Sequence, residues 1–285
     1  MAIVYSLGDV RDKKIPKLES FNEVFKFAKD ELTKSKAVIG GMFYGSVFFG
    51  QYQINSDVDA IVVYDANKFD EFQKVKKTIK LYAKKLHVHF QLDQSPNHIY
   101  SGLFNPINIG SFLRYLEASS KVEGSIIKNN PFDVTTMMPY KHFSQDQKYD
   151  DIRRFLSSKY FKIDNDYSNC EFGDENFYRS LTRIFQTISQ LCRNMLYYYG
   201  IEFVDNSSDD TLLDFYGKIA DAKSVELLRD LFAGKDQYWY ALKDAFDLYD
   251  ENDYTDALLE VKELAPKLKN LIEMNMKLVS IKPVR

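Results

Sequence analysis

The residues best suited to chemistry are two aspartates, Asp57 and Asp59, which open a run of apolar, β-prone residues. Side-chain directions repeat every two residues along a strand, so both carboxylates are predicted to lie on one side of it, about 6–7 Å apart. Such a pair of hard oxygen ligands suits Mg²⁺, which proteins hold through one or two carboxylates plus substrate phosphates. We expect both acids to be exposed in a cleft.

A glycine–serine turn precedes this acid pair. Gly45 and Ser46 follow an apolar run at residues 37–44, and their backbone N–H groups and the serine hydroxyl could hold the terminal phosphates of a nucleotide. Alternatively, Ser46 only caps the next helical turn, a role that overlaps with the first because a capping hydroxyl can also lie near phosphate. Gly50 is expected to let the connecting segment pack closely, and Ser56 stands directly before the acids.

The spacing of these residues is similar to a family signature. Gly45-Ser46, ten intervening residues and Asp57-x-Asp59, followed by the apolar residues 61–63, resemble the motif of the DNA polymerase β-like nucleotidyltransferases. The resemblance covers roughly residues 18–93 and extends more loosely to the following half, which is similar to antibiotic and minimal nucleotidyltransferases with helical domains. The competing interpretation, two acids that merely begin a strand behind a turn-forming serine, leaves the glycines unexplained.

The resemblance implies an Mg²⁺-dependent enzyme that moves a nucleoside monophosphate from a nucleoside triphosphate to an acceptor hydroxyl. AMP from ATP is the most plausible choice, and pyrophosphate would be released. Two Mg²⁺ ions would be ligated by Asp57 and Asp59, and the nucleotide would be bound by Gly45, Ser46 and Ser56.

In this family a third carboxylate comes from a later strand, which here corresponds to residues 87–93. Alternation places Val88, Phe90 and Leu92 on one face of it and His89, Gln91 and Asp93 on the other. Asp93 is the only acid among the latter, so it is the candidate third metal ligand and base. If the family's acid position corresponds instead to His89 or Gln91, and Asp93 only forms a turn before residues 94–97, the site lacks the third carboxylate that activity requires.

The surrounding sequence predicts an α+β fold in two domains. Helical periodicity at residues 18–32 and 69–86 alternates with the β-prone runs, which predicts a mixed sheet with flanking helices, the nucleotidyltransferase domain, over residues 1–135. Residues 136–285 are predicted to form an all-α helical bundle. Its helices are expected at 149–160, 177–199, 211–219, 224–232, 238–248 and 254–278, with Gly200 ending the second and Pro266 kinking or dividing the last.

The composition indicates what class of protein this is and in which compartment it is expected. Hydrophobic residues make up 45% and charged residues 28% of the 285 residues, which is typical of a folded globular protein. Cys170 and Cys192 are too few for a disulfide scaffold, which favours a reducing compartment. The sequence shows neither a signal peptide nor a membrane span, so we expect a cytoplasmic protein without a membrane partner.

The charge distribution bears on the acceptor. Residues 1–150 carry a net charge of +3 and residues 151–285 one of −6, which favours a cationic small molecule, such as an aminoglycoside, over nucleic acid. Six lysines between positions 74 and 85 form either a solvated helix face or an anchor for a polyanion. The alternatives are an enzyme that modifies a protein or tRNA in a toxin–antitoxin or defence system, and a catalytically degenerate protein that binds a nucleotide or a partner.

Overall fold

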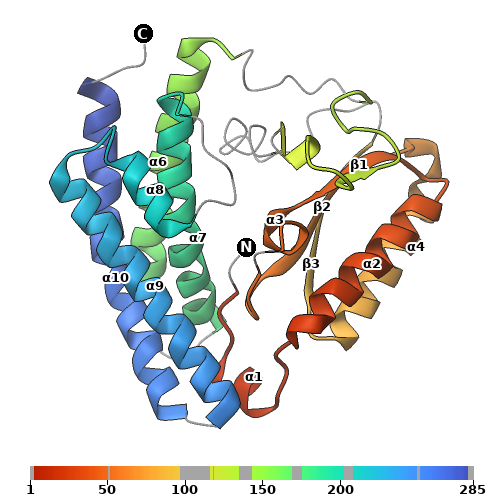
Figure 1. Ribbon diagram of the computed structural model, residues 1–285, viewed down its shortest axis with the longest axis horizontal. Helices are drawn as coiled ribbons and strands as arrows, with labels where there is room; N and C mark the ends of the chain where they lie inside the picture. The colour runs from red at the N-terminus through yellow and green to blue at the C-terminus, as the bar shows by residue number, and fades with distance from the viewer. Residues whose placement is uncertain are drawn as a thin grey trace. The chain divides into compact units, whose positions relative to one another are not determined.

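A computed structural model describes residues 3–50, 52–96, 116–117, 119–134, 143–168, 175–201, 208–248 and 251–281 (Figure 1). The fold is α+β, with a mixed four-stranded sheet and helices, as the sequence predicts. Contacts divide the chain into two compact units, one from Ile15 to Phe143 and one that joins the segment up to Lys14 to the residues from Ser144 onward. The expected boundary between positions 135 and 136 lies outside the described residues.

The first unit contains the sheet. Its elements are α2 (Leu18–Lys34), β1 (Val38–Tyr44), α3 (Gly45–Phe48), β2 (Asp57–Tyr64), the 3₁₀ turn η1 (Ala66–Lys68), α4 (Phe69–Lys85), β3 (His89–Pro96) and β4 (Ile126–Ile127). The strand order is β3-β2-β1-β4, with β1 antiparallel to both β2 and β4 and with β2 parallel to β3. The central strand is therefore β2, which begins with the two aspartates.

Helices α2 and α4 lie side by side against one face of this sheet (Figure 1). The apolar positions predicted for the first helix, such as Phe21, Val24 and Leu32, are completely buried. They join a core with the alternate residues of β2, among them Val58 and Ala60. Because successive strand residues point to opposite faces, this packing fixes which residues of β2 point away from the two helices.

The second unit is helical in its described part. It comprises α1 (Leu7–Arg11), α6 (Gln145–Ser168), α7 (Glu175–Tyr198), α8 (Asp209–Tyr216), α9 (Ala222–Leu248) and α10 (Glu251–Ile281). Gly200, at a φ of +70°, donates its N–H to the Tyr197 carbonyl and ends α7, which confirms the predicted glycine stop. None of the described helices is both long and apolar enough to span a membrane.

Several helix boundaries differ from the sequence prediction. Helix α6 extends beyond the expected residues 149–160 at both ends. The helices expected at 224–232 and 238–248 are one continuous helix, in which Gly234 permits close packing of α9 on α10 because a Cβ there would lie 2.8 Å from Leu264. Pro266 lies inside α10 and does not divide it. Buried neighbours, among them Ala265 and Leu268, anchor this stretch by tertiary packing, which outweighs the missing backbone hydrogen bond.

The N-terminal segment is attached to the helical unit, although the expected division placed it with the sheet. The Val4 N–H donates to Thr182 Oγ1 at 3.1 Å, and the Tyr254 hydroxyl donates to the Tyr5 carbonyl oxygen at 2.7 Å. The Tyr254 hydroxyl also lies 3.0 Å from that of Tyr238, and both rings are fully buried.

We predict that Tyr254→Phe lowers the free energy of unfolding by about 1–3 kcal/mol, because it removes a buried hydroxyl that is hydrogen-bonded to the Tyr5 carbonyl and lies beside the Tyr238 hydroxyl. Thermal unfolding should shift down by about 2–4 °C per kcal/mol. Tyr240→Phe is the control, since that side chain is 70% exposed. Equal melting temperatures for the two variants would show that these hydrogen bonds contribute no stability.

Candidate functional site

The candidate site begins at the first residues of the central strand. Val58 and Ala60 point into the core under α2 and α4, so Asp57 and Asp59 share the opposite face of β2, as the alternation predicts. The expectation that both acids are exposed is wrong, because Asp57 is 0% and Asp59 is 5% exposed. Gly45, the first residue of the short helix α3, lies against Asp59, so the turn after β1 contributes to this burial.

The two carboxylates lie close enough for the charge of Asp57 to act on Asp59. Burial, and then the charge of Asp57, raise the pKa of Asp59 well above its usual value. The His89 imidazole, on the neighbouring strand β3, lies near Asp57, with Nδ1 3.7 Å from Asp57 Oδ2. A bound cation would remove the repulsion between the two acids, which is the behaviour expected of a pair of metal ligands.

The glycine–serine turn lies directly against this acid pair. Tyr44, the last residue of β1, is opposite Asp59 in the sheet, and Gly45 follows at a φ of +87°. A Cβ atom at Gly45 would stand 2.3 Å from Asp59 Oδ2, so only glycine fits both the backbone angle and the space. The half-buried Ser46 comes next, and its hydroxyl has no hydrogen bond to any residue that the structure describes.

The connector between the turn and the acids has a structural role in its described part. The Ser56 hydroxyl accepts a hydrogen bond from the Gln53 N–H at 3.0 Å, and the Ser56 N–H donates to the Gln53 carbonyl at 2.9 Å. Ser56 thus closes a turn directly before β2. The explanation expected for Gly50 is wrong, because an added Cβ there would meet nothing within 4 Å; its φ of +72° is what favours glycine.

Asp93 is two positions farther along the sheet than the acid pair. In the parallel register Asp57 faces His89, Asp59 faces Gln91, and Asp93 faces Ile61. Since these positions alternate with the core-facing ones, Asp93 shares the face of β2 and β3 that carries the two other acids.

Tyr44 ties Asp93 to the rest of the site, a role that the sequence analysis missed. Its hydroxyl donates to Asp93 Oδ2 at 2.6 Å, and Gln91 Nε2 lies 3.5 Å from the same oxygen. Burial raises the pKa of Asp93, and the Tyr44 hydrogen bond partly offsets that rise. The signal available in the sequence was a tyrosine directly before Gly45, at the end of a strand that pairs with the acid-bearing one.

In comparisons with known proteins, no family model matches the chain and no curated sequence is significantly similar to it. The assignment of a function therefore depends on the residues and their geometry.

The carboxylates fit a cation that arrives with a phosphate ligand better than a metal held by protein alone. Within the described ranges, no group of three or more histidine, cysteine, aspartate or glutamate side chains is arranged to hold a metal ion. Asp57 and Asp59 nevertheless supply two hard oxygen ligands, and Mg²⁺ commonly takes its remaining ligands from water and substrate phosphates. The donor set is thus suited to an Mg²⁺–nucleotide complex.

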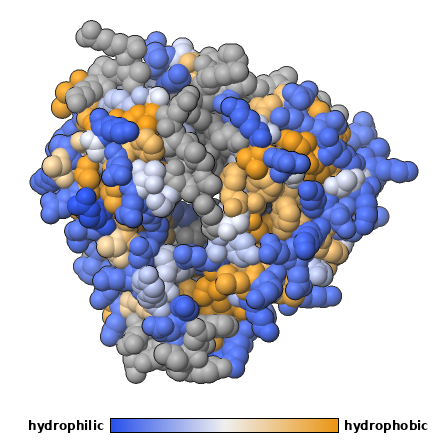
Figure 2. Space-filling model, viewed as in Figure 1, coloured by the Kyte–Doolittle hydropathy of each residue, from blue (hydrophilic) through white to orange (hydrophobic). Residues whose placement is uncertain are grey.

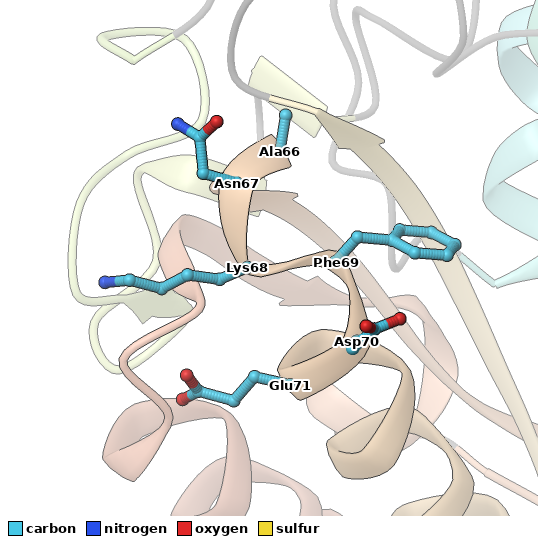
Figure 3. Close-up of a pocket in the computed structure, with 6 residues that line it drawn as sticks. All are labelled: Ala66, Asn67, Lys68, Phe69, Asp70 and Glu71. Atoms are coloured by element: carbon cyan, nitrogen blue, oxygen red, sulfur yellow. The ribbon is translucent and has the colours of Figure 1, made fainter.

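A shallow pocket elsewhere in the unit is separate from this site. It is lined by the consecutive residues Ala66 to Glu71, where η1 passes into α4 (Figure 3). Lys68 and Phe69 point to opposite sides of the chain there (Figure 3). The pocket follows the last residue of β2, whereas the aspartates occupy the first positions, about 20 Å away along the strand. It therefore contributes no residue to the carboxylate site.

Proposed function

We propose that the protein is a nucleotidyltransferase that moves a nucleoside monophosphate, AMP by preference, from a triphosphate to an acceptor hydroxyl. The observation that carries the proposal is the contact between Gly45 and Asp59, because it brings a phosphate-compatible turn against a buried pair of carboxylates. Within this buried pair the pKa of Asp59 is raised well above its usual value, and groups with such shifts concentrate at functional sites.

Each residue of the site has a proposed role in binding the metal or the nucleotide. Asp57 and Asp59 would hold Mg²⁺, which supplies charge neutralisation for the phosphates when it is bound. The Gly45 backbone and the Ser46 hydroxyl would bind the terminal phosphates, whose oxygens favour N–H and O–H donors. The pyrophosphate is thereby positioned to leave in line with the attacking hydroxyl, and positioning of this kind is the main source of catalysis in phosphoryl transfer.

Asp93 is the proposed general base. Its carboxylate would take the proton of the acceptor hydroxyl as the oxygen attacks the α-phosphorus, while the bond to pyrophosphate breaks. A pKa raised by burial makes this carboxylate a stronger base, which suits proton transfer near neutral pH. Tyr44, which donates to Asp93 Oδ2, would orient it.

A second candidate is a protein that binds a nucleotide without transferring it. The register favours it, because the positions facing Asp57 and Asp59 hold His89 and Gln91 rather than an acid.

The choice of acceptor is a separate question. The Asp209 carboxylate belongs to the acidic half of the sequence that favours a cationic acceptor, and it is itself paired with Lys235. The acceptors to be tested therefore include nucleic acid and protein as well as cationic small molecules.

The two candidates are separated by Mg²⁺-dependent release of pyrophosphate from each nucleoside triphosphate, with aminoglycosides, RNA and protein as acceptors. We expect release to be fastest with ATP, to stop with EDTA, and to fall by about 10²–10⁴-fold in Asp93→Asn. The control is Asp70→Asn, which removes an exposed acid from the first turn of α4.

The possible outcomes of this experiment distinguish the two candidate functions. Nucleotide binding without pyrophosphate release in the presence of any acceptor would favour the non-catalytic candidate. Equal release by the wild type and Asp93→Asn would remove Asp93 from the mechanism. The absence of any nucleotide binding would contradict both candidates.

A further inference from the structure

One face of α4 carries a concentration of positive charge that the carboxylate site does not use. Lys74, Lys77, Lys80, Lys84 and Lys85 are all exposed. At 100° per residue they fall within about 140° of the helix circumference. Phe72, Ile79 and Ala83 occupy the opposite side and are buried in the core. We refer to the five exposed lysines as the α4 lysine stripe.

Among the residues that the structure describes, no acid lies in ion-pair contact with the α4 lysine stripe. The acids of α4, Asp70 and Glu71, are confined to its first turn. None of the five lysines forms an ion pair with a residue in the described part of the chain. The neighbouring helix α2 carries acids of its own, but Asp30 is paired there with Lys34 at 3.6 Å.

The charge of the α4 lysine stripe also acts on a neighbouring lysine, Lys76. Burial, followed by the charge of Lys80, lowers the pKa of Lys76 on the flank of the same helix. Figure 2 shows a largely hydrophilic surface over α2 and α4.

The dimensions of the stripe match a nucleic-acid backbone. From Lys74 to Lys85 the helix rises by about 16 Å, at 1.5 Å per residue. One strand of a duplex rises by about 3.4 Å per phosphate along the duplex axis, so the length of the stripe corresponds to about five nucleotides of one strand.

The apolar content of the face argues against a membrane. A helix that lies in a bilayer interface buries a broad apolar face. The apolar side of α4 is already buried in the protein core, and Leu81, 52% exposed, is the large apolar residue in the middle of the lysine stripe.

The C-terminal end of the α4 lysine stripe lies close to the start of β3 along the chain. Helix α4 begins after the end of β2 and finishes at Lys85, four residues before His89, which starts β3 opposite Asp57. Its C-terminal lysines are therefore at the same end of the sheet as the carboxylate pair. A polyanion on the stripe would extend toward that end.

From these observations we infer that the α4 lysine stripe is a binding surface for the phosphate backbone of a nucleic acid, recognised without regard to base sequence. The inference does not depend on the proposed transfer reaction. It assigns a partner to a unit whose charge is locally basic, although the whole chain has a net charge of −3.

The test is fluorescence anisotropy with a labelled 20-nucleotide RNA and a 20-base-pair DNA duplex, at 50 and 200 mM salt. With five phosphate contacts, the affinity of the wild type should fall about a hundredfold for the single-stranded RNA and about five-hundredfold for the DNA duplex between the two salt concentrations. The triple variant Lys77→Gln, Lys80→Gln, Lys84→Gln should bind at least tenfold more weakly at 50 mM salt and show a shallower salt dependence. The corresponding triple Lys→Arg variant should retain binding.

The matched control is Lys223→Gln, Lys243→Gln, Lys277→Gln, which removes the same charge from exposed positions of the helical unit. It should bind like the wild type. The inference is overturned if neither probe binds at 50 mM salt, or if the α4 variant binds as tightly as the control. It is also overturned if the wild type binds phosphatidylserine vesicles in preference to both nucleic acids. Melting temperatures of the variants, expected to be unchanged for exposed positions, show that weaker binding is not unfolding.

Discussion

Replacing Asp59 with asparagine is expected to abolish nucleotide transfer while leaving the fold at least as stable as the wild type. Asparagine has nearly the same shape, so the packing of Gly45 against this side chain is kept. The loss of a charged metal ligand should reduce the turnover at least about a thousandfold. The buried repulsion from Asp57 disappears at the same time, so the melting temperature should stay the same or rise.

The combination of readouts makes this prediction specific. A residue that acts only in the fold would lower both activity and melting temperature when it is replaced. Asp57→Asn should lose activity in the same way, because the two acids are proposed to hold one cation together. Transfer at the wild-type rate by either variant would show that the carboxylate pair is not the metal site.

The second large effect is expected at Gly45. In Gly45→Ala the backbone must keep a φ near +87° with a side chain present, and the new Cβ would stand 2.3 Å from Asp59 Oδ2. Both effects oppose folding, and together they should cost about 2–3 kcal/mol of unfolding free energy. The displaced Asp59 carboxylate should also lower transfer by about a hundredfold, because a shift of about 1 Å in an active site has that effect.

Gly50→Ala is the matched control for Gly45→Ala. Gly50 also has a positive φ, +72°, but a Cβ there meets nothing within 4 Å. We expect a loss of about 1–2 kcal/mol from backbone strain alone and unchanged transfer. Similar activity in the two variants, measured as pyrophosphate release at equal concentrations of folded protein, would contradict a specific role for the Gly45 contact.

Much of the sheet-bearing unit follows from local sequence patterns. The 3.6-residue period of α2 and the apolar runs of β1 and β2 predicted those elements to within two residues. The two-residue alternation placed Asp57 with Asp59, and His89 with Asp93, on a common face, because that periodicity is a property of any strand. These patterns act over short distances, and the sequence displays them directly.

Features set by distant residues were harder to predict. The close packing around Asp59 depends on the turn at Gly45, and the two helices that join into α9 do so where Gly234 packs closely against Leu264. The hydrogen bond from Tyr44 to Asp93 joins residues 49 positions apart and follows from the strand order β3-β2-β1. Tertiary contacts of this kind override local propensity. Neither the continuity of α9 nor the hydrogen-bond partner of Asp93 could therefore be predicted from the local pattern alone.

The most direct test of the central claim is calorimetric titration of the protein with α,β-methylene-ATP, an analogue that cannot be cleaved at the α-phosphorus. If Asp57 and Asp59 hold Mg²⁺ together with a triphosphate, the wild type should bind the analogue at least about tenfold more tightly with Mg²⁺ than with EDTA. The double variant Asp57→Asn, Asp59→Asn should lose this difference. Equal affinity with and without Mg²⁺ in the wild type, or an undiminished Mg²⁺ effect in the double variant, would contradict the account.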